Sequence, residues 1–537
     1  MGTSAPLKIW LLISAAAIAI HLGGPPLIDA DEGRNAEVAR EMAATNDYVV
    51  PRLNTLPYLD KPIVYFAAEA AMMEILGPTE LAARLPAYLF TLATAALVFW
   101  WTRKRIGADE ALVGAIAFLA MPLTVAFARI VIFDSALAFF IVLSNLALYE
   151  AVETRDKRWT ILAWAAIAAG VLTKGPVAIA VPLLVMIPYA IWRKAFRMLW
   201  SFIGLIVFVA IVTPWVWGVS REVPDFLEYV LITETAARLA TDELQRTGPP
   251  WYFLPYLVGG ALPWSIVAIA GWRDWKRRDP ILIFLLLWIL VPLVFFSISQ
   301  SKRPQYILPV MPAVAMLIAW NWRTLRVRAA AIVAASFGVL LITAAFVPRL
   351  TAKMQPSLVG ATKQTAIALG AALLFGGIIA AIVRRRDVAL IGLSLPVIAI
   401  PLLANPLMHA LGERRSARSF VAAIEAAAGP QAPVIGIEAF TGSMAFYLGR
   451  PVVVATDDAS EFTSNYILRR YERYSGAPGS PVKPLPWIDQ SLAECCERRI
   501  YVVRDDDPHH HQRLEAAGAR KVVTGPHHIA YVHTGRN

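Results

Sequence analysis

Charged residues are scarce in this chain. Asp, Glu, Lys and Arg make up 17% of its 537 residues, whereas about 25% is usual in soluble domains, and hydrophobic residues reach 58%. This balance excludes an ordinary soluble protein and indicates a polytopic membrane protein. A spanning helix needs about 20 mostly apolar residues, and about thirteen candidates fit before residue 408, the first being a retained span from Ile9. The sequence therefore predicts an α-helical membrane domain over residues 1–410 and a small soluble α/β domain over 411–537.

Cysteine is nearly absent, and the pattern of histidines is equally uninformative. The two cysteines, Cys495 and Cys496, are adjacent, and neighbouring cysteines rarely bridge each other, so no disulfide framework is expected. The histidines at 509–511 are consecutive and cannot all face one ion, so no metal site is expected there. Solenoid repeats and low-complexity segments are also missing from the sequence.

Positive charge is dispersed in small clusters. The formal net charge of +11, if gathered on one surface, would suggest nucleic-acid binding. Instead Lys and Arg occupy every second loop between predicted spans, which is the positive-inside pattern of cytoplasmic loops. The clusters lie at 103–105, 155–158, 193–197, 273–278, 323–328 and 384–386. We interpret them as topology signals, which places the alternate loops and the C-terminal domain on the periplasmic side.

The first outer loop, residues 25–80, is expected to hold two helices along the membrane surface. Apolar residues recur at helical spacing from Asp31 to about Thr45, with charged residues on the other face, and a second helix is expected to begin at Pro62. The C-terminal domain is expected to contain a helix at Ser419–Ala428 and strands at Pro433–Glu438, Pro451–Ala455, Arg499–Val503 and Lys521–Val523.

Three segments of the predicted outer loops share one design. In Asp60-Lys61-Pro62, Thr173-Lys174-Gly175-Pro176 and Ser301-Lys302-Arg303-Pro304, a cation precedes a proline that is expected to open an apolar helix. Proline favours the first helical position, where free N–H groups attract anions. One such lysine would be interpreted as snorkelling at a helix end. Three of them on the side where cations are scarce predict a phosphate site, which Arg238, Arg246 and Arg303 are expected to join.

Carboxylates accompany these cations. Asp31 and Glu32 lie in the first outer loop, Asp60 precedes Lys61, and Asp134 lies where an apolar span begins. An acidic group at membrane depth is costly and is usually paired or functional. Such a carboxylate could act as a general base toward a hydroxyl, or could hold a divalent cation that neutralises a leaving phosphate. Both roles stay open.

Several motifs coincide in order and spacing with those of one family. They are Asp31-Glu32-Gly33-Arg34, Ala36-Glu37, Arg40-Glu41-Met42, Asn54, Pro57-Tyr58, Lys61-Pro62, Arg84-Leu85-Pro86, Leu172 to Pro176 and Ser301 to Pro309. Over roughly residues 8–410 the chain resembles the bacterial aminoarabinose transferase and protein-mannosyltransferase superfamily. The resemblance implies an inverting glycosyltransferase of the GT-C type, with a polyprenyl-phosphate (undecaprenyl-phosphate) sugar donor, acting on the periplasmic face of the bacterial inner membrane.

The resemblance also implies roles for particular residues. Asp31 would be the leading catalytic carboxylate and Asp134 a second acidic residue of the site. The donor phosphate would be bound by Lys61 and Lys174, and the donor cavity would be lined by Lys302 and Tyr306.

A divalent metal ion is a further implication. In the aminoarabinose transferase, an acidic residue before the Lys-Pro motif and a histidine in a later loop hold a metal. Asp60 fits the first position, but the loop 220–250 contains no histidine and has Gln245-Arg246 near the expected place. The need for a metal therefore stays open, and no organic cofactor is expected.

A flippase or transporter of lipid-linked sugars is the alternative function. Transporters place polar groups near the bilayer midplane, often in two related halves. Here the charged groups gather in the predicted outer loops, and the two halves show no similarity. The sugar and the acceptor stay open; lipid A, another envelope lipid, a polysaccharide and protein hydroxyls are all compatible with the sequence.

Overall fold

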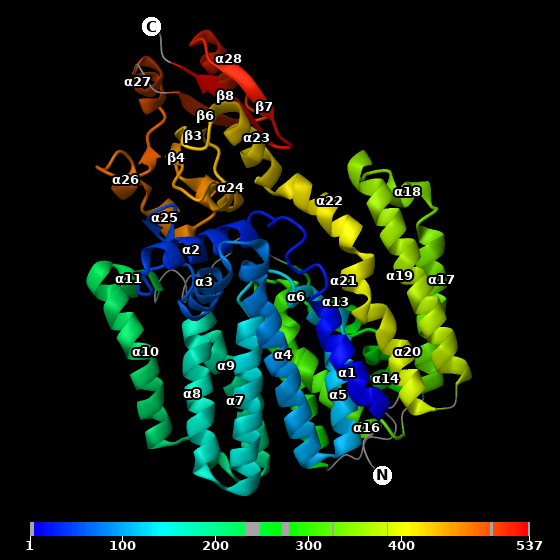
Figure 1. Cartoon of the computed structure of the whole chain (residues 1–537). Helices are drawn as coiled ribbons and strands as arrows, with labels where there is room; N and C mark the ends of the chain where they lie inside the picture. Colours follow the sequence, from blue (N-terminus) through cyan, green and yellow to red (C-terminus); the bar gives the residue numbers. More distant parts are fainter. Residues whose placement is uncertain are drawn as a thin grey trace. The chain divides into compact units, whose positions relative to one another are not determined.

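The structure is a computed structural model that describes residues 5–230, 248–270, 279–324, 327–383, 385–494 and 498–534 (Figure 1). Two residues expected at the phosphate site, Arg238 and Arg246, lie outside the described residues. The chain divides into two compact units. The first, here called the helical unit, comprises residues 1–22 and 84–407. The second, the mixed unit, comprises residues 23–83 and 408–537.

The helical unit consists of apolar helices and short turns. Its elements are α1 (Ala5–Ile18), α4 (Glu80–Arg105), α5 (Ala108–Leu119), α6 (Pro122–Phe127), α7 (Asp134–Thr154), α8 (Lys157–Lys174), α9 (Val177–Trp192), η1 (Phe196–Leu199), α10 (Phe202–Glu222), α11 (Phe226–Glu228), α13 (Phe253–Gly260), α14 (Trp264–Ala270), α15 (Pro280–Ile298), η4 (Pro304–Val310), α16 (Met311–Asn321), α17 (Val327–Ala344), α18 (Pro348–Thr351), α19 (Pro356–Ile382), α20 (Arg386–Ile398) and α21 (Ile400–Leu403). Helix α8 lies beside both α7 and α10 (Figure 1).

Many of these helices have the length and composition of membrane spans. Among the described residues, seven helical stretches qualify: Glu80–Arg105, Asp134–Thr154, Phe196–Glu222, Pro280–Ile298, Val327–Ala344, Pro356–Ile382 and Arg386–Arg415. Two shorter apolar helices, Ala5–Ile18 and Val177–Trp192, accompany them. The chain is therefore a multi-pass membrane protein, as predicted, while the count of about thirteen spans stays a prediction.

Helix α7 carries charged groups at both ends of a buried apolar stretch. Asp134 at its start pairs with Lys174 at 2.6 Å, and Glu150 near its end pairs with Lys104 and Arg105, each at 2.6 Å. Since an α-helix rises 1.5 Å per residue, the two acidic residues are about 24 Å apart, close to the thickness of a hydrocarbon core. The cluster 103–105, which was predicted to be cytoplasmic, thus lies at the opposite end of α7 from Lys174.

A cluster of rings holds the middle of the helical unit together. Trp101 of α4, Tyr149 of α7, Tyr189 of α9 and Phe284 of α15 are buried, with ring centroids 4.5 to 5.8 Å apart. Edge and offset contacts of this kind add to the gain from apolar burial. The four helices are thereby fixed against one another, which gives α7 a rigid support for its charged ends.

The mixed unit contains a six-stranded sheet. Its strands are β3 (Val434–Ile437), β4 (Val453–Ala455), β5 (Val482–Lys483), β6 (Arg499–Arg504), β7 (Arg520–Thr524) and β8 (His528–His533), in the order β5-β4-β3-β6-β8-β7. Strands β5, β4, β3 and β6 are parallel, and β8 is antiparallel to both β6 and β7. The accompanying helices are α22 (Asn405–Arg415), α23 (Arg418–Ala428), α24 (Gly442–Leu448), η5 (Ser460–Phe462), α25 (Asn465–Arg469), α26 (Tyr471–Tyr474), α27 (Trp487–Ala493) and α28 (Pro508–Ala516).

The predicted α/β character of the C-terminal region is confirmed. All four expected strands and the expected helix are present within one or two residues of their predicted bounds. Sequence reasoning missed β5, which has only two residues, and β8, whose apolar residues are flanked by histidines.

The first outer loop belongs to the mixed unit, although the sequence had placed it with residues 1–410. It contains α2 (Asp31–Thr45), a hairpin of β1 (Arg52–Leu53) and β2 (Leu56–Pro57), and α3 (Val64–Leu76). Helix α2 has the predicted bounds, and α3 begins at Val64 rather than at Pro62.

Two glycines allow α2 to pack directly against α24. A Cβ atom at Gly33 would lie 2.5 Å from the backbone nitrogen of Ser443, and one at Gly442 would lie 2.3 Å from the Cα of Arg34. Contacts that short do not occur, so glycine is required on both sides. Asp29, just before α2, adds a hydrogen bond from the Ser443 N–H at 3.0 Å.

The hairpin of β1 and β2 is joined to the C-terminal domain by side-chain hydrogen bonds. The side chain of Asn54 donates to the carbonyl of Val452 at 2.7 Å and accepts from the N–H of Val452 at 2.8 Å. Asn54 is fully buried and has a positive φ of 53°, a conformation that asparagine tolerates better than most residues. These bonds explain why residues 23–83 form one unit with the C-terminal sheet.

Candidate active site

Each unit contains part of the predicted set of functional residues. The helical unit holds Asp134, Lys174, Lys302, Arg303 and Tyr306, and the mixed unit holds Asp31, Asp60 and Lys61.

An ion pair between two helix ends is the centre of the site in the helical unit. Lys174 is the last residue of α8, and its Nζ donates to Oδ1 of Asp134, the first residue of α7, at 2.6 Å. The helix dipoles favour a cation at the C-terminal end of α8 and an anion at the N-terminal end of α7. The side chains are 16% and 3% exposed, so the pair is largely desolvated. The second oxygen of Asp134, Oδ2, is buried and has no hydrogen-bond partner among the described residues.

Tyr306 joins this pair from a third element. The Lys174 ammonium lies 5.2 Å from the centre of the Tyr306 ring, within the range of a cation–π contact. The Tyr306 ring also stacks near Phe253, at 6.3 Å between centroids. The structure therefore brings together Asp134 and Lys174, which topology had predicted to share one side of the membrane, and Tyr306, which the family resemblance had predicted to line the donor cavity.

Lys302 is buried beside an apolar cavity. Its side chain is 9% exposed, and its Nζ donates to the backbone carbonyl of Ser299 at 2.7 Å. Within the described part of the chain, no carboxylate pairs with this ammonium group. The adjoining cavity has a volume of about 590 Å³ and is lined mainly by apolar side chains such as Trp251, Leu254 and Leu293. A buried cation without an anionic partner is costly, and a bound anion would relieve that cost.

The expectation that each lysine precedes a helix-opening proline is corrected in part. Only Pro304 occupies the first position of its helix, the short 3-10 helix η4, where it follows Arg303. Pro176 lies one residue before α9, and Pro62 lies outside α3. Lys174 is positioned instead by the C-terminal end of α8.

Asp31 is the first residue of α2 and is one of the more accessible acidic groups of the first loop. Its carboxylate accepts a hydrogen bond from Arg34 at 2.7 Å, and its side chain is 42% exposed. The Arg34 guanidinium also donates to Thr463 and lies 5.7 Å from the centre of the Tyr58 ring. Arg34 is thus immobilised on several sides, so it fixes the orientation of Asp31 without burying it.

Asp60 has a structural partner in the mixed unit. Its two carboxylate oxygens accept the backbone N–H groups of Asn465 and Tyr466, at 3.0 and 3.1 Å, at the start of α25. A carboxylate at a helix N-terminus satisfies free N–H groups there. Neighbouring Lys61 donates to the backbone carbonyl of Asp60. Both oxygens of Asp60 thus have a structural role within the mixed unit. Metal binding by Asp60 stays a prediction.

Helices α2 and α3 also contain buried carboxylates, which sequence reasoning placed on an exposed face or did not single out. Glu37 is fully buried and pairs with Arg40 at 2.6 Å, so α2 is covered on both sides rather than amphipathic. Glu69 of α3 is fully buried, and neither of its oxygens has a hydrogen-bond partner among the described residues. Burial and the nearby Glu32 raise the pKa of Glu69 well above its ordinary value, which favours the protonated form.

Comparisons with known proteins show which families and folds the chain resembles. A family model described as dolichyl-phosphate-mannose-protein mannosyltransferase matches residues 60–217, a range that includes Lys61, Asp134 and Lys174. The undecaprenyl phosphate-alpha-4-amino-4-deoxy-L-arabinose arabinosyl transferase 2 of Proteus mirabilis is 32% identical over 303 residues, which is 54% of this chain and 54% of that protein. The corresponding transferase of Serratia proteamaculans is 31% identical over 329 residues, 58% of each chain. The match spans little more than half the length of these curated relatives.

The match to solved structures extends over the whole chain. The crystal structure of ArnT from Cupriavidus metallidurans bound to undecaprenyl phosphate has a TM-score of 0.86, with 25% identity and 100% of both chains covered. The predicted family resemblance is confirmed. The chain has the GT-C fold of ArnT, including the C-terminal sheet, and the structure of ArnT in the apo state is similar with a TM-score of 0.84.

Proposed function

We propose that this chain is an inverting glycosyltransferase that moves a sugar from a polyprenyl phosphate, such as undecaprenyl phosphate, to an acceptor of the bacterial envelope. The observation that carries the proposal is the buried ammonium of Lys302 beside an apolar cavity of about 590 Å³. A polyprenyl phosphate suits both features, because its phosphate offers an anion to the ammonium group and its chain offers apolar surface to the cavity. The names of the relatives and the undecaprenyl phosphate bound to ArnT support the same donor class.

On this proposal Lys174 binds the donor phosphate, and Asp134 positions the ammonium group of Lys174. When a sugar leaves a phosphate, negative charge develops on the phosphate oxygens, and a fixed cation in a site of low dielectric stabilises that charge strongly. The 2.6 Å contact with Asp134 and the ring of Tyr306 hold the ammonium in place before the donor arrives. Lys302 and Arg303, which belong to the same unit, add positive charge for the same phosphate.

Asp31 is the proposed catalytic base. An acceptor hydroxyl attacks the anomeric carbon, the bond to the phosphate oxygen breaks, and the carboxylate of Asp31 takes the hydroxyl proton. Its accessibility and its fixed orientation by Arg34 suit this role. A single displacement from the face opposite the phosphate inverts the configuration of the sugar. No step above depends on a metal at Asp60.

The first donor to test is the one that the relatives' names contain, and the first acceptor is one of those that the sequence left open. We propose aminoarabinose carried on undecaprenyl phosphate as the first donor and lipid A as the first acceptor, with transfer on the periplasmic side of the inner membrane. Orientation rests on the cation clusters and on the separation of Lys174 from the cluster 103–105 along α7.

Transfer by the purified full-length protein in detergent tests the proposal. Wild-type protein should convert the donor in the presence of acceptor, and Asp31→Asn should lower kcat at least about 100-fold while leaving the protein folded. Asp457→Asn, which changes an exposed carboxylate of the same unit, is the matched control and should retain activity. Full activity of Asp31→Asn would remove Asp31 from the mechanism.

The same assay separates an enzyme from a flippase. A transferase forms product in detergent, where there is no membrane to cross, whereas a flippase forms none. Mass spectrometry of envelope lipids and glycans from a deletion strain would then identify the natural sugar and acceptor.

A further inference from the structure

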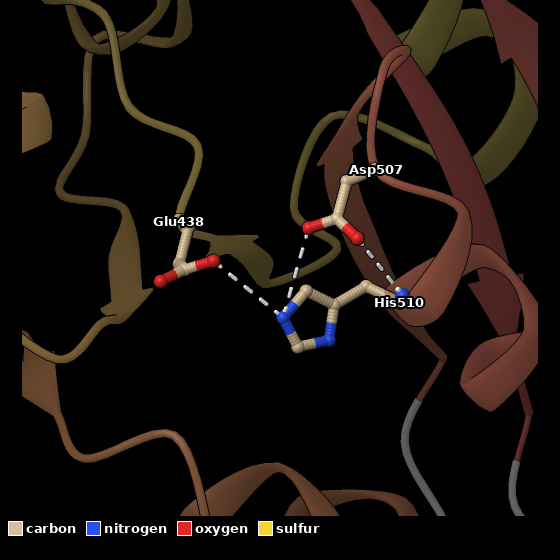
Figure 2. A group of neighbouring side chains, drawn as sticks. All are labelled: Glu438, Asp507 and His510. Carbon is tan, nitrogen blue, oxygen red and sulfur yellow. Dashed lines mark hydrogen bonds and ion pairs between the residues drawn. The ribbon is translucent and has the colours of Figure 1, made fainter.

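We propose that the C-terminal domain binds a divalent transition-metal ion through Glu438, Asp507 and His510. Figure 2 shows the three side chains pointing toward one another from two separate segments. Their candidate ligand atoms all lie within 4.8 Å of one another. This site is independent of the proposed transferase reaction and of the predicted metal at Asp60.

The position of the cluster in the sheet is the first argument. Chain order runs from β3 outward to β4 and β5, then returns to β6 on the other side of β3. Strands β3 and β6 are parallel neighbours, so the chain leaves them in opposite directions and a crevice opens at their carboxyl ends. Glu438 directly follows β3, and Asp507 and His510 follow β6. The three residues thus lie where open α/β sheets place their ligands.

The backbone holds the two carboxylates in position. Glu438 has a positive φ of 46°, and its N–H donates to the carbonyl of Ala455 at 2.8 Å. Such a conformation is costly for a residue with a side chain, and residues of this kind cluster at functional sites. Asp507 caps α28 by accepting the N–H of His510 through Oδ1 at 3.2 Å. The other oxygen of Asp507, Oδ2, faces the imidazole ring.

The buried imidazole is the second and independent observation. His510 is 5% exposed, and its Nε2 lies 3.6 Å from Glu438 Oε2 and 3.8 Å from Asp507 Oδ2. These separations are longer than hydrogen bonds. The other ring nitrogen, Nδ1, is buried and has no hydrogen-bond partner among the described residues. The ring is therefore aimed at two carboxylates that it does not hydrogen-bond.

A metal ion explains this spacing. Ligand atoms bound tetrahedrally to zinc at about 2.0 to 2.2 Å are roughly 3.3 to 3.6 Å apart. Small rotations of the carboxylates would bring all three ligand atoms to those distances. Glu438 is 38% exposed, so a water molecule or an external ligand can complete the coordination. One imidazole and two carboxylates suit Zn²⁺ better than Ca²⁺ or Mg²⁺, which prefer oxygen ligands alone.

The neighbouring histidines do not share the site. His509 is exposed, and Nδ1 of His511 is hydrogen-bonded to the hydroxyl of Tyr531 at 3.0 Å. The argument that consecutive histidines cannot face one ion therefore holds, but it does not exclude one of them. The signal that sequence reasoning lacked is the closeness of Glu438, which comes from the pairing of β3 with β6.

Titration of Zn²⁺ into the purified full-length chain, without a histidine tag and after removal of bound metal, tests the proposal. Calorimetry should give a Zn²⁺ site that is weakened more than about 100-fold in His510→Ala and Glu438→Gln, and Zn²⁺ should raise the unfolding temperature of the wild type but not of these two variants. His509→Ala is the matched control and should bind Zn²⁺ like the wild type.

Two further arms complete the experiment. Asp60→Asn should keep the site, which separates it from the predicted metal of the first loop. Ca²⁺ and Mg²⁺ in tenfold excess over Zn²⁺ should not displace it. If the wild type binds no Zn²⁺, or if both His510→Ala and Glu438→Gln bind as tightly as the wild type, the three residues form only an ion-pair cluster and the proposal is wrong. Since Glu438 is partly exposed, Glu438→Gln decides the question even if His510→Ala unfolds.

Discussion

Asp29 and Asp60 of the mixed unit, and Lys174 and Lys302 of the helical unit, are charged groups that the fold satisfies to different degrees. In the mixed unit, Asp29 and Asp60 accept backbone N–H groups and thereby attach residues 23–83 to the C-terminal domain. In the helical unit, Lys174 pairs with a side chain whose second oxygen is buried without a partner, and Lys302 has no carboxylate partner among the described residues. Charge in the first case is satisfied by the fold itself. Charge in the second is left incomplete, which is the condition expected of a site that waits for an ionic ligand.

Replacement of Lys174 should have the largest effect. Lys174→Met should lower transfer by about 100-fold to 1,000-fold, because the leaving phosphate loses a fixed cation. It should also destabilise the protein by about 3 to 5 kcal/mol, since Asp134 is left buried without its counter-ion. Transfer kinetics and thermal unfolding in detergent measure the two effects separately.

A double variant sharpens this prediction. Lys174→Met with Asp134→Asn removes both charges, so most of the lost stability should return while transfer stays low. Recovery of transfer in the double variant would show that Lys174 serves only to neutralise Asp134.

A change of pH should have the next largest effect, on the stability of the mixed unit. Burial raises the pKa of the Asp29 carboxyl from its ordinary value of 3.8 to about 6. Because the folded state holds the proton more tightly, this stabilisation is fully present below pH 3.8 and is lost as the pH rises through about 6. The change is on the order of 3 kcal/mol. Hydrogen exchange around Ser443 should show it, and Asp29→Asn should make the profile flatter than that of the wild type.

Removal of the Asp60 carboxylate should have a smaller effect on stability. Asp60→Ala leaves the N–H groups of Asn465 and Tyr466 without their acceptor, which should cost about 1 to 3 kcal/mol. Limited proteolysis of the loop 23–83 would measure the loss, with Asp457→Ala as the control. If the loss appears only when a divalent metal is present, Asp60 acts through a metal rather than through α25.

The smallest effect is expected at the cation clusters that are predicted to set topology. Arg385 is 74% exposed and pairs with Asp387 at 3.2 Å. Arg385→Ala should change stability by less than about 0.5 kcal/mol and should leave transfer unchanged. A large loss of transfer would mean that these clusters do more than orient the chain.

The sequence predicted the apolar helices of the helical unit and the closeness of Asp134 and Lys174. Long apolar runs specify spans, and the alternation of cation clusters predicted that Asp134 and Lys174 lie on one side, where the structure brings them into contact. What made this possible is that a membrane restricts each loop to one of two faces, so topology alone predicts proximity.

The mixed unit could not be predicted as well. The contacts of Asp60 with α25, of Asn54 with Val452 and of Gly33 with Ser443 join residues that are about 400 positions apart, and no local pattern announces them. Helical spacing made α2 appear amphipathic, because a single sequence cannot show that its charged face is covered by another segment. The cluster of Glu438 and His510 was missed for the same reason.

Binding of undecaprenyl phosphate to the purified protein tests the central claim most directly. We expect Lys302→Met to weaken binding more than about 30-fold, since it removes the buried cation that pairs with the phosphate, whereas Lys353→Met, at an exposed lysine of the same unit, should bind like the wild type. Equal affinities of wild type, Lys302→Met and Lys174→Met would contradict the account, because the incomplete charges of the helical unit would then have no phosphate to bind.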